Sequence, residues 1–112
     1  MQQIEWAQFE AVDMRVGTVV RAEAFPEARK PAYKLWVDFG DEIGIRQSSA
    51  QLTRVYTLEE LPGRQVIGVV NFPPKRIAGF ESQCLICGLD RSPGEVVLIQ
   101  PSEPVPNGAR LY

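Results

Sequence analysis

Alternation of side chains with a period of two dominates the first third of the sequence and restricts the chain to a β-rich fold. Residues 15–25 alternate in this way up to Pro26, and residues 33–39 alternate again after a polar turn. Successive side chains of a strand point to opposite faces, so each stretch is expected to form a strand with two different faces.

The middle and the end of the chain supply further strands. The turn signal GDEIG separates the second stretch from Ile43, Ile45 and Gln47, a spacing that predicts a hairpin between the second and third strands. A strand that is apolar on both faces is central or covered. Such a strand and two shorter ones are expected in the segments 65–70, 84–88 and 95–100.

Three segments lack the alternation. Residues 4–12 favour a short helix, and residues 49–61, which end at Pro62-Gly63, favour a helical or irregular crossover. The segment 71–83 is expected to be a loop, because Pro73 and Pro74 exclude a central strand. The tail 101–112 ends in two apolar residues, so it is expected to pack against the barrel or a second subunit.

These elements predict one all-β domain that spans residues 1–112. The length allows one modest core, and 45% apolar with 23% charged residues is a globular balance. The expected fold is a closed, five-stranded β-barrel of OB type with a short N-terminal helix, a helical crossover after the third strand and a C-terminal extension. A β-sandwich is the alternative. One face of an OB barrel and its flanking loops bind extended chains.

The composition excludes the common kinds of catalysis. The chain has no histidine, which removes the usual general base and the most common metal ligand. Cys84 and Cys87 cannot complete a zinc site alone, and their odd spacing in a strand separates their side chains, so both are interpreted as core thiols. Gly-rich phosphate motifs are missing. We therefore expect neither an enzyme nor a bound metal or cofactor.

Two polar segments, each directly after a predicted strand, contain the candidate binding residues. In one, Lys75 and Arg76 suit phosphates, and Asn71, Ser82 and Gln83 suit base edges or a peptide backbone. The aromatic residues of the same segment suit base stacking or contact with an apolar peptide. The alternative is that these segments are ordinary surface loops without a binding role. The other segment contributes Arg46, Gln47, Ser48 and Ser49.

The net charge of −2 argues against a general attraction to nucleic acid but leaves room for a local basic stripe. The N-terminal segment has no basic cluster and no apolar run. A cytoplasmic location without membrane insertion is therefore expected.

Long stretches of the sequence are similar to the CsaA secretion chaperones. They include FEAVDMRVGTVVRAEAFPEARKPAYKLWVDFG, IGIRQSSAQLT, NFPPKRIAGFESQCLICG and QPSEPVPNGARLY, and the resemblance runs from about Phe9 to Leu111. CsaA in turn resembles the tRNA-binding domains that are appended to some aminoacyl-tRNA synthetases or occur as free dimers. The resemblance implies an OB fold in a two-fold homodimer. The N-terminal helix, barrel strands and the C-terminal tail would contribute to the interface, which would supply partners for Trp6, Phe9, Leu111 and Tyr112.

The resemblance also implies an activity. CsaA proteins bind unfolded or export-destined preproteins without ATP and help deliver them to the secretion machinery, including the SecA motor. In the tRNA-binding relatives, the segments that match Arg46 to Ser49 and Lys75 to Gln83 contact RNA. Two hypotheses follow for this chain, a chaperone for preproteins and a tRNA-binding protein.

The two hypotheses use neighbouring residues. A tRNA would meet Arg46, Lys75 and Arg76 through phosphates and Phe80 or Asn71 through a base. An unfolded preprotein would bury apolar side chains in a groove bordered by Trp36, Phe72, Pro73, Ile77 and Phe80.

Overall fold

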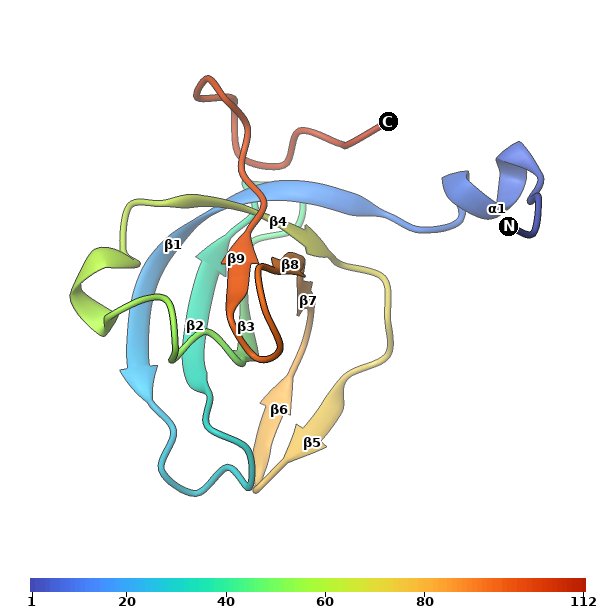
Figure 1. Ribbon diagram of the computed structural model, residues 1–112. Coiled ribbons are helices and arrows are strands. Elements are labelled where there is room, and N and C mark those ends of the chain that lie inside the picture. The colour runs from blue at the N-terminus through green and yellow to red at the C-terminus, as the bar shows by residue number, and fades with distance from the viewer.

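The computed structural model describes residues 1–112 and shows a mostly β protein with a short N-terminal helix (Figure 1). The elements in chain order are α1 (Trp6–Glu10), β1 (Met14–Ala24), β2 (Tyr33–Asp38), β3 (Ile45–Ala50), the 3-10 turn η1 (Leu58–Glu60), β4 (Gln65–Val69), β5 (Lys75–Ile77), β6 (Phe80–Ser82), β7 (Leu85–Ile86), β8 (Gly88–Asp90) and β9 (Val96–Leu98). Neither α1 nor η1 has the length and apolar character of a membrane-spanning helix.

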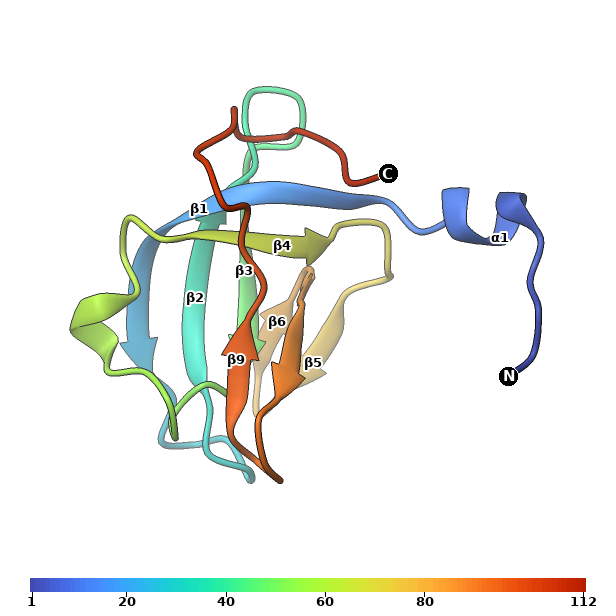
Figure 2. The same ribbon diagram turned by 45° about the horizontal axis from the view of Figure 1, so that its top comes forward.

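Strand β1 holds the sheet together because its two halves pair with different neighbours. Met14–Thr18 pairs antiparallel with β4, and Thr18–Ala24 pairs antiparallel with β2. The register shifts between Val19 and Arg21, and a bulge of this kind bends a strand and increases its twist. The sheet, in the order β3-β2-β1-β4-β7, therefore curls into a nearly closed, OB-like barrel (Figures 1 and 2). The predicted barrel is confirmed in this form.

The two edges of the sheet, β3 and β7, meet at a seam. The Ser48 hydroxyl donates a hydrogen bond of 2.8 Å to the carbonyl of Cys84, and the Gln83 amide donates one of 2.8 Å to the carbonyl of Gln47. Ser48 is only 1% exposed. Side-chain and loop contacts thus close the barrel where strand pairing stops.

The core lies inside the barrel and is centred on Phe39, which is fully buried together with Leu35 and Val37. Two glycines leave room for its ring: a Cβ on Gly17 would come within 2.8 Å of the Phe39 Cδ1 atom, and one on Gly68 within 2.7 Å of its Cζ atom. The sequence alternation at 33–39 correctly indicated which face of β2 is buried.

The predicted helical crossover after the third strand is wrong, because this connection contains only the 3-10 turn η1. Tertiary hydrogen bonds fix the backbone of this segment instead. The Tyr33 hydroxyl donates to the carbonyl of Tyr56, and the Tyr56 hydroxyl accepts from the amide of Leu98. With Leu52 and Leu61 anchored in the core, the chain crosses the barrel in irregular turns.

The expectation of a loop at 71–83 is wrong in part, because β5 and β6 form a hairpin there. Ala78 and Gly79, with φ of 47° and 81°, occupy its two-residue turn. Positive φ at both positions is typical of the type I′ turn, whose twist matches that of paired strands. The prolines do keep this segment out of the barrel sheet, as expected.

The two chain ends leave the barrel at the same side. The tail runs along β1, where Leu111 donates to the carbonyl of Met14 and Arg110 pairs with Arg15, so the expected packing of the tail on the barrel is confirmed. Residues 1–12, called the arm below, carry α1 away from the barrel (Figure 2). No residue of α1 is buried.

Candidate functional site

A groove beside the β5–β6 hairpin brings together residues of both predicted sets. Phe72, Pro73 and Ile77 line it, and so do Lys75 and the β3 residue Ser49. The groove has a volume of about 460 Å³, and its remaining lining residues are Gln51, Ser82, Cys84 and Leu85. This hairpin groove combines apolar walls with hydroxyl and amide groups, a combination that suits an extended peptide.

Trp36 and Phe80, the other two predicted peptide contacts, lie elsewhere, in a cation–aromatic cluster where β1 and β2 meet the start of β6. The Phe80 ring lies 6.0 Å from Trp36 and 5.5 Å from Phe25, edge to face in both pairs. The Arg21 guanidinium covers the Trp36 ring at 4.4 Å, and the Lys34 ammonium lies 5.2 Å from Phe80. Positive charge over aromatic faces suits stacked bases and phosphates.

Several predicted RNA contacts hold the hairpin on the barrel. The Gln47 side chain donates to the carbonyl of Glu81 at 2.8 Å, and the Ser49 amide donates to the Ser82 hydroxyl at 3.2 Å. The Gln47 amide donates to the Gln83 side chain at 3.1 Å. These polar groups therefore position the hairpin between the groove and the cluster, and the buried Ser48 offers no surface to a ligand.

The remaining predicted contacts are dispersed. Arg76 is exposed on the hairpin and donates to the Gly79 carbonyl at 2.9 Å, and Arg46 is half-buried on β3. Asn71 lies at the base of the arm, where its side chain accepts from the Asp13 amide at 3.0 Å and donates to the Ala11 carbonyl at 2.8 Å.

Sequence reasoning missed Arg21, Phe25 and Lys34. Alternation places Lys34 and Trp36 on the same outer face of β2, which was a usable signal. Arg21 lies opposite Trp36 only because of the bulge in β1. Phe25 reaches Phe80 only because the β1–β2 loop meets the hairpin tip, and no local pattern reports such a contact.

The two cysteines are free. Burial raises the pKa of the Cys84 thiol to about 11 and raises that of Cys87 as well. Both thiols therefore stay protonated at neutral pH, as inert core or groove-lining groups.

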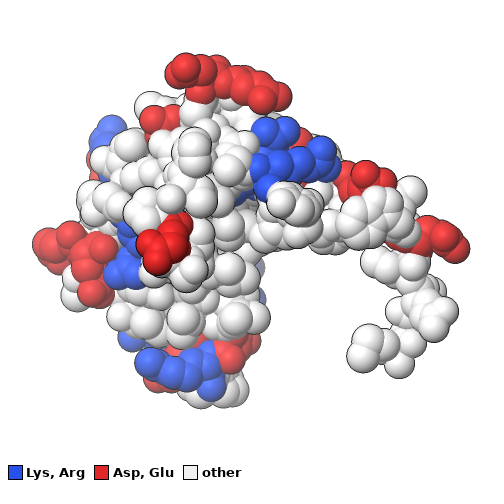
Figure 3. Space-filling view, turned by 90° about the horizontal axis from the view of Figure 1, so that it is seen from above, with Lys and Arg blue, Asp and Glu red and all other residues white.

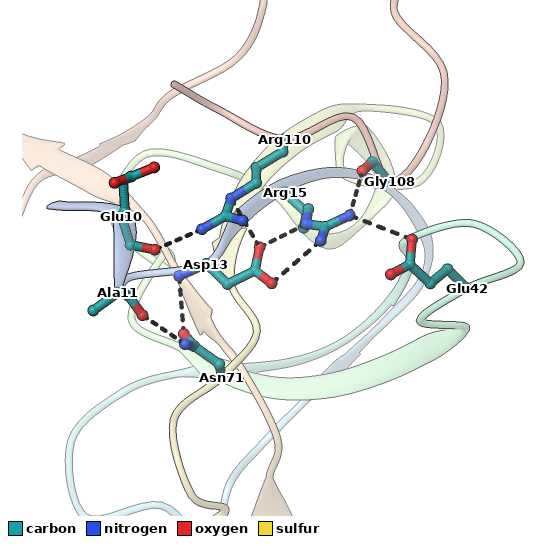
Figure 4. Close-up of polar contacts among 8 residues, drawn as sticks. All are labelled: Glu10, Ala11, Asp13, Arg15, Glu42, Asn71, Gly108 and Arg110. Carbon is teal, nitrogen blue, oxygen red and sulfur yellow. Dashed lines mark hydrogen bonds and ion pairs between the residues drawn. The ribbon is translucent and has the colours of Figure 1, made fainter. Parts of the chain in front are cut away.

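The base of the arm is fixed by a charge network centred on Asp13 (Figure 4). The Asp13 carboxylate accepts from the Arg15 Nε at 2.6 Å, and the Arg110 Nε lies 3.6 Å away. Arg110 also donates to the carbonyl of Glu10 at 2.6 Å. Lys and Arg atoms gather where the arm leaves the barrel (Figure 3). The network ties the arm, β1 and the tail together.

The hydrogen bond from Arg15 lowers the pKa of Asp13 below its usual value, and attraction to Arg15 and Arg110 acts in the same direction. The carboxylate therefore stabilises the fold above its unfolded pKa, near 3.9, and this contribution is lost as the pH falls through the lower folded pKa.

Replacing Asp13 with asparagine is expected to lower the free energy of unfolding by on the order of 1 kcal/mol at pH 7, because charged hydrogen bonds are lost at a partly exposed site. Urea unfolding at pH 7 and pH 2.5 tests this, and the difference from wild type should approach zero in acid. Asp41→Asn, at an exposed residue, is the control and should have little effect. An Asp13→Asn defect that persists in acid contradicts the assignment.

All four predicted dimer-interface residues gather between the arm and the tail. Trp6, Phe9, Leu111 and Tyr112 line one hollow of about 160 Å³, and the Trp6 and Phe9 ring centroids lie 5.3 Å apart. Trp6 is 64% exposed and Tyr112 is 98% exposed. An apolar arm of this kind lacks a covering surface within its own chain.

Comparison with known proteins identifies the family to which this chain belongs. A protein-family model described as "Putative tRNA binding domain" matches residues 14–110. The chaperone CsaA from Bacillus anthracis is 49% identical with a TM-score of 0.94, covering 99% of this chain and 100% of that chain. The CsaA chaperone protein from Picrophilus torridus is 42% identical with a TM-score of 0.91, covering 98% of this chain and 100% of that chain.

Longer proteins contain a similar domain. The methionine–tRNA ligase of Methanothrix thermoacetophila is 41% identical over 108 residues, which are 96% of this chain. The chain spans only 15% of the length of that enzyme. The similarity to the two CsaA structures, by contrast, covers both chains almost completely. The chain therefore belongs to the tRNA-binding-domain family, and within it to the CsaA type, a non-catalytic family.

Proposed function

We propose that this protein is an ATP-independent chaperone that binds unfolded or export-destined preproteins in the hairpin groove and assists their delivery to a SecA-type motor. The observation that carries the proposal is the groove itself, in which exposed Phe72, Pro73 and half-buried Ile77 lie beside the polar Ser49 and Ser82. The similarity of the whole chain to two proteins described as CsaA chaperones supports the same function.

The groove suits weak, reversible binding. Burial of one large apolar side chain contributes about 1.5–3 kcal/mol, so a few shallow contacts hold an unfolded segment without trapping it. Ser49 and Ser82 can exchange hydrogen bonds with the backbone of an extended peptide. Such contacts are independent of the client's side chains, which is what a chaperone with many clients requires.

We further propose that the protein acts as a homodimer through the arm and the tail. Trp6 and Tyr112 are largely exposed, and a second copy that covers them would remove a large apolar surface from water. The dimer would present two hairpin grooves. Two linked sites bind one long unfolded chain more tightly than either site does alone.

Binding of tRNA is a second candidate, favoured by the cation–aromatic cluster and by the match to the tRNA-binding family model. The half-buried Phe80 offers an aromatic edge beside Lys34, and the buried Phe25 supports it from below. Each phosphate contact is expected to steepen the dependence of log affinity on log salt by about 0.7 to 0.9.

One experiment separates the two functions, because the groove and the cluster do not share their central residues. We expect Ile77→Asp to weaken the binding of a labelled, unfolded preprotein segment about tenfold or more, since it places a charge in an apolar wall. Ile45→Asp is the matched control, at an isoleucine that is 59% exposed away from the groove. Fluorescence anisotropy titrations measure both affinities.

Lys34→Gln is expected to reduce the salt slope of tRNA binding, whereas Lys34→Arg keeps the charge and the slope. Equal losses of preprotein binding for Ile77→Asp and Ile45→Asp would contradict the groove as the chaperone site. If the protein binds tRNA tightly but does not suppress the aggregation of unfolded preproteins, its function is tRNA binding. If neither the preprotein segment nor tRNA binds, both proposed functions are excluded.

A further inference from the structure

The hairpin groove continues into a second hollow across the seam of the barrel. This hollow, of about 590 Å³, lies between the segment 49–52 at the end of β3 and the segment 85–90 of β7 and β8, with Val96 of β9 beside them. Ser49, Gln51 and Leu85 line both spaces. The two hollows therefore adjoin across these three residues, and together they are called the seam groove below.

The walls of the seam groove are apolar and exposed along its length. Phe72 is 53% exposed at the hairpin end, Leu85 is 52% exposed in the middle, and Leu89 is 64% exposed at the far end. A patch of large, exposed apolar side chains marks an interaction site more often than the rest of a protein surface does. Ser49 and Gln51 supply polar groups where the two hollows adjoin.

The charges of the seam groove have opposite signs and lie one in each hollow, outside the part that the two hollows share. Lys75 is the only charged residue that lines the hairpin groove, and Asp90 is the only one that lines the second hollow. Both side chains are exposed, and neither takes part in an ion pair. An apolar surface with free charges of opposite sign at its ends is complementary to a ligand of the same pattern.

We propose that the seam groove binds an extended apolar segment of an unfolded polypeptide that carries a cationic side chain at one end and an anionic one at the other. This rests on the proposed peptide-binding function and adds to it a second subsite and a charge preference. The cationic end lies against Asp90 and the anionic end against Lys75. Ser49 and Gln51 meet the peptide backbone between them.

Three capped apolar peptides of equal length test the charge pattern without assuming a chain direction. One carries Lys at one end and Glu at the other, the second Lys at both ends, and the third Glu at both ends. An exposed ion pair changes affinity up to about fivefold, so wild type should prefer the first peptide by a few-fold over each of the others.

Charge reversal should redirect this preference. Asp90→Lys makes both ends of the seam groove positive and should favour the peptide with two Glu residues by about fivefold to tenfold. Lys75→Glu should favour the peptide with two Lys residues. Glu103→Lys is the control, because Glu103 is exposed outside the seam groove. The preferences should fade at 1 M salt, where exposed charges are screened.

The outcomes are distinguishable from failure of the proposed function. Equal affinity of wild type for all three peptides overturns the charge preference while peptide binding itself stands. No binding of any peptide overturns the proposed function. Leu89→Asp should weaken all three peptides, and if it instead weakens only self-association, the occupant is a second copy and the proposal is wrong. If tRNA displaces the peptides while Leu89→Asp leaves their affinity unchanged, the surface is assigned to RNA.

Discussion

Replacing Phe39 with alanine is expected to lower the free energy of unfolding by about 3–5 kcal/mol, a large part of the stability of a domain of this size. The ring is fully buried at the centre of the barrel and fills space that Gly17 and Gly68 leave open. Its loss leaves a cavity that β1 and β4 cannot close, because strand pairing holds both in place.

Urea unfolding, followed by circular dichroism at a fixed protein concentration, measures this effect. Phe72→Ala is the matched control, because that side chain is 53% exposed and should contribute less than about 1 kcal/mol. Similar losses for the two variants would show that the core is not centred on Phe39. A fixed concentration matters because dimer formation would add to the apparent stability.

Replacing Trp6 with alanine is expected to raise the dissociation constant of the proposed homodimer by about 100-fold or more. A two-fold interface contains each residue twice, so one substitution removes two indole rings. Each ring that becomes buried contributes about 1.5–3 kcal/mol, and the two contributions add in the dissociation constant. The arm has no buried residue of its own in α1, so the substitution should leave the barrel intact.

Analytical ultracentrifugation from nanomolar to micromolar protein measures the change. Trp36→Ala is the control, because this second tryptophan lies on the outer face of β2 beside Arg21. A wild-type protein that sediments near 12.5 kDa at micromolar concentration would refute the dimer. Equal weakening by both tryptophan variants would place the interface elsewhere.

Part of the candidate site was predictable. Four residues after β4 are close neighbours along the chain and line the same groove, so the sequence alone indicates them: Phe72, Pro73, Lys75 and Ile77. Trp36 and Phe80 were predicted for the same groove, but they contact one another outside it. Distance along the chain says little about which side of a hairpin a residue faces.

The sequence by itself determined the strands and the buried face of the barrel. Alternation at 33–39 places Leu35, Val37 and Phe39 on one face of the strand, and that face is buried in the core. A shift of one residue in the strand pairing would move all three side chains to the outer face. The prolines of the hairpin segment were an equally local signal, which correctly kept that segment out of the barrel sheet but did not report its hairpin.

The tertiary structure alone decided the contacts between segments. The crossover lost its predicted helix because Tyr33, Tyr56 and Leu98 fix its backbone with hydrogen bonds between distant residues. Arg21 faces Trp36 only because β1 bulges, and the seam groove exists only because β3 and β7, the two edges of the sheet, meet without strand pairing. Local propensity is a matter of neighbouring residues, whereas these features depend on how a closed sheet brings remote ones together.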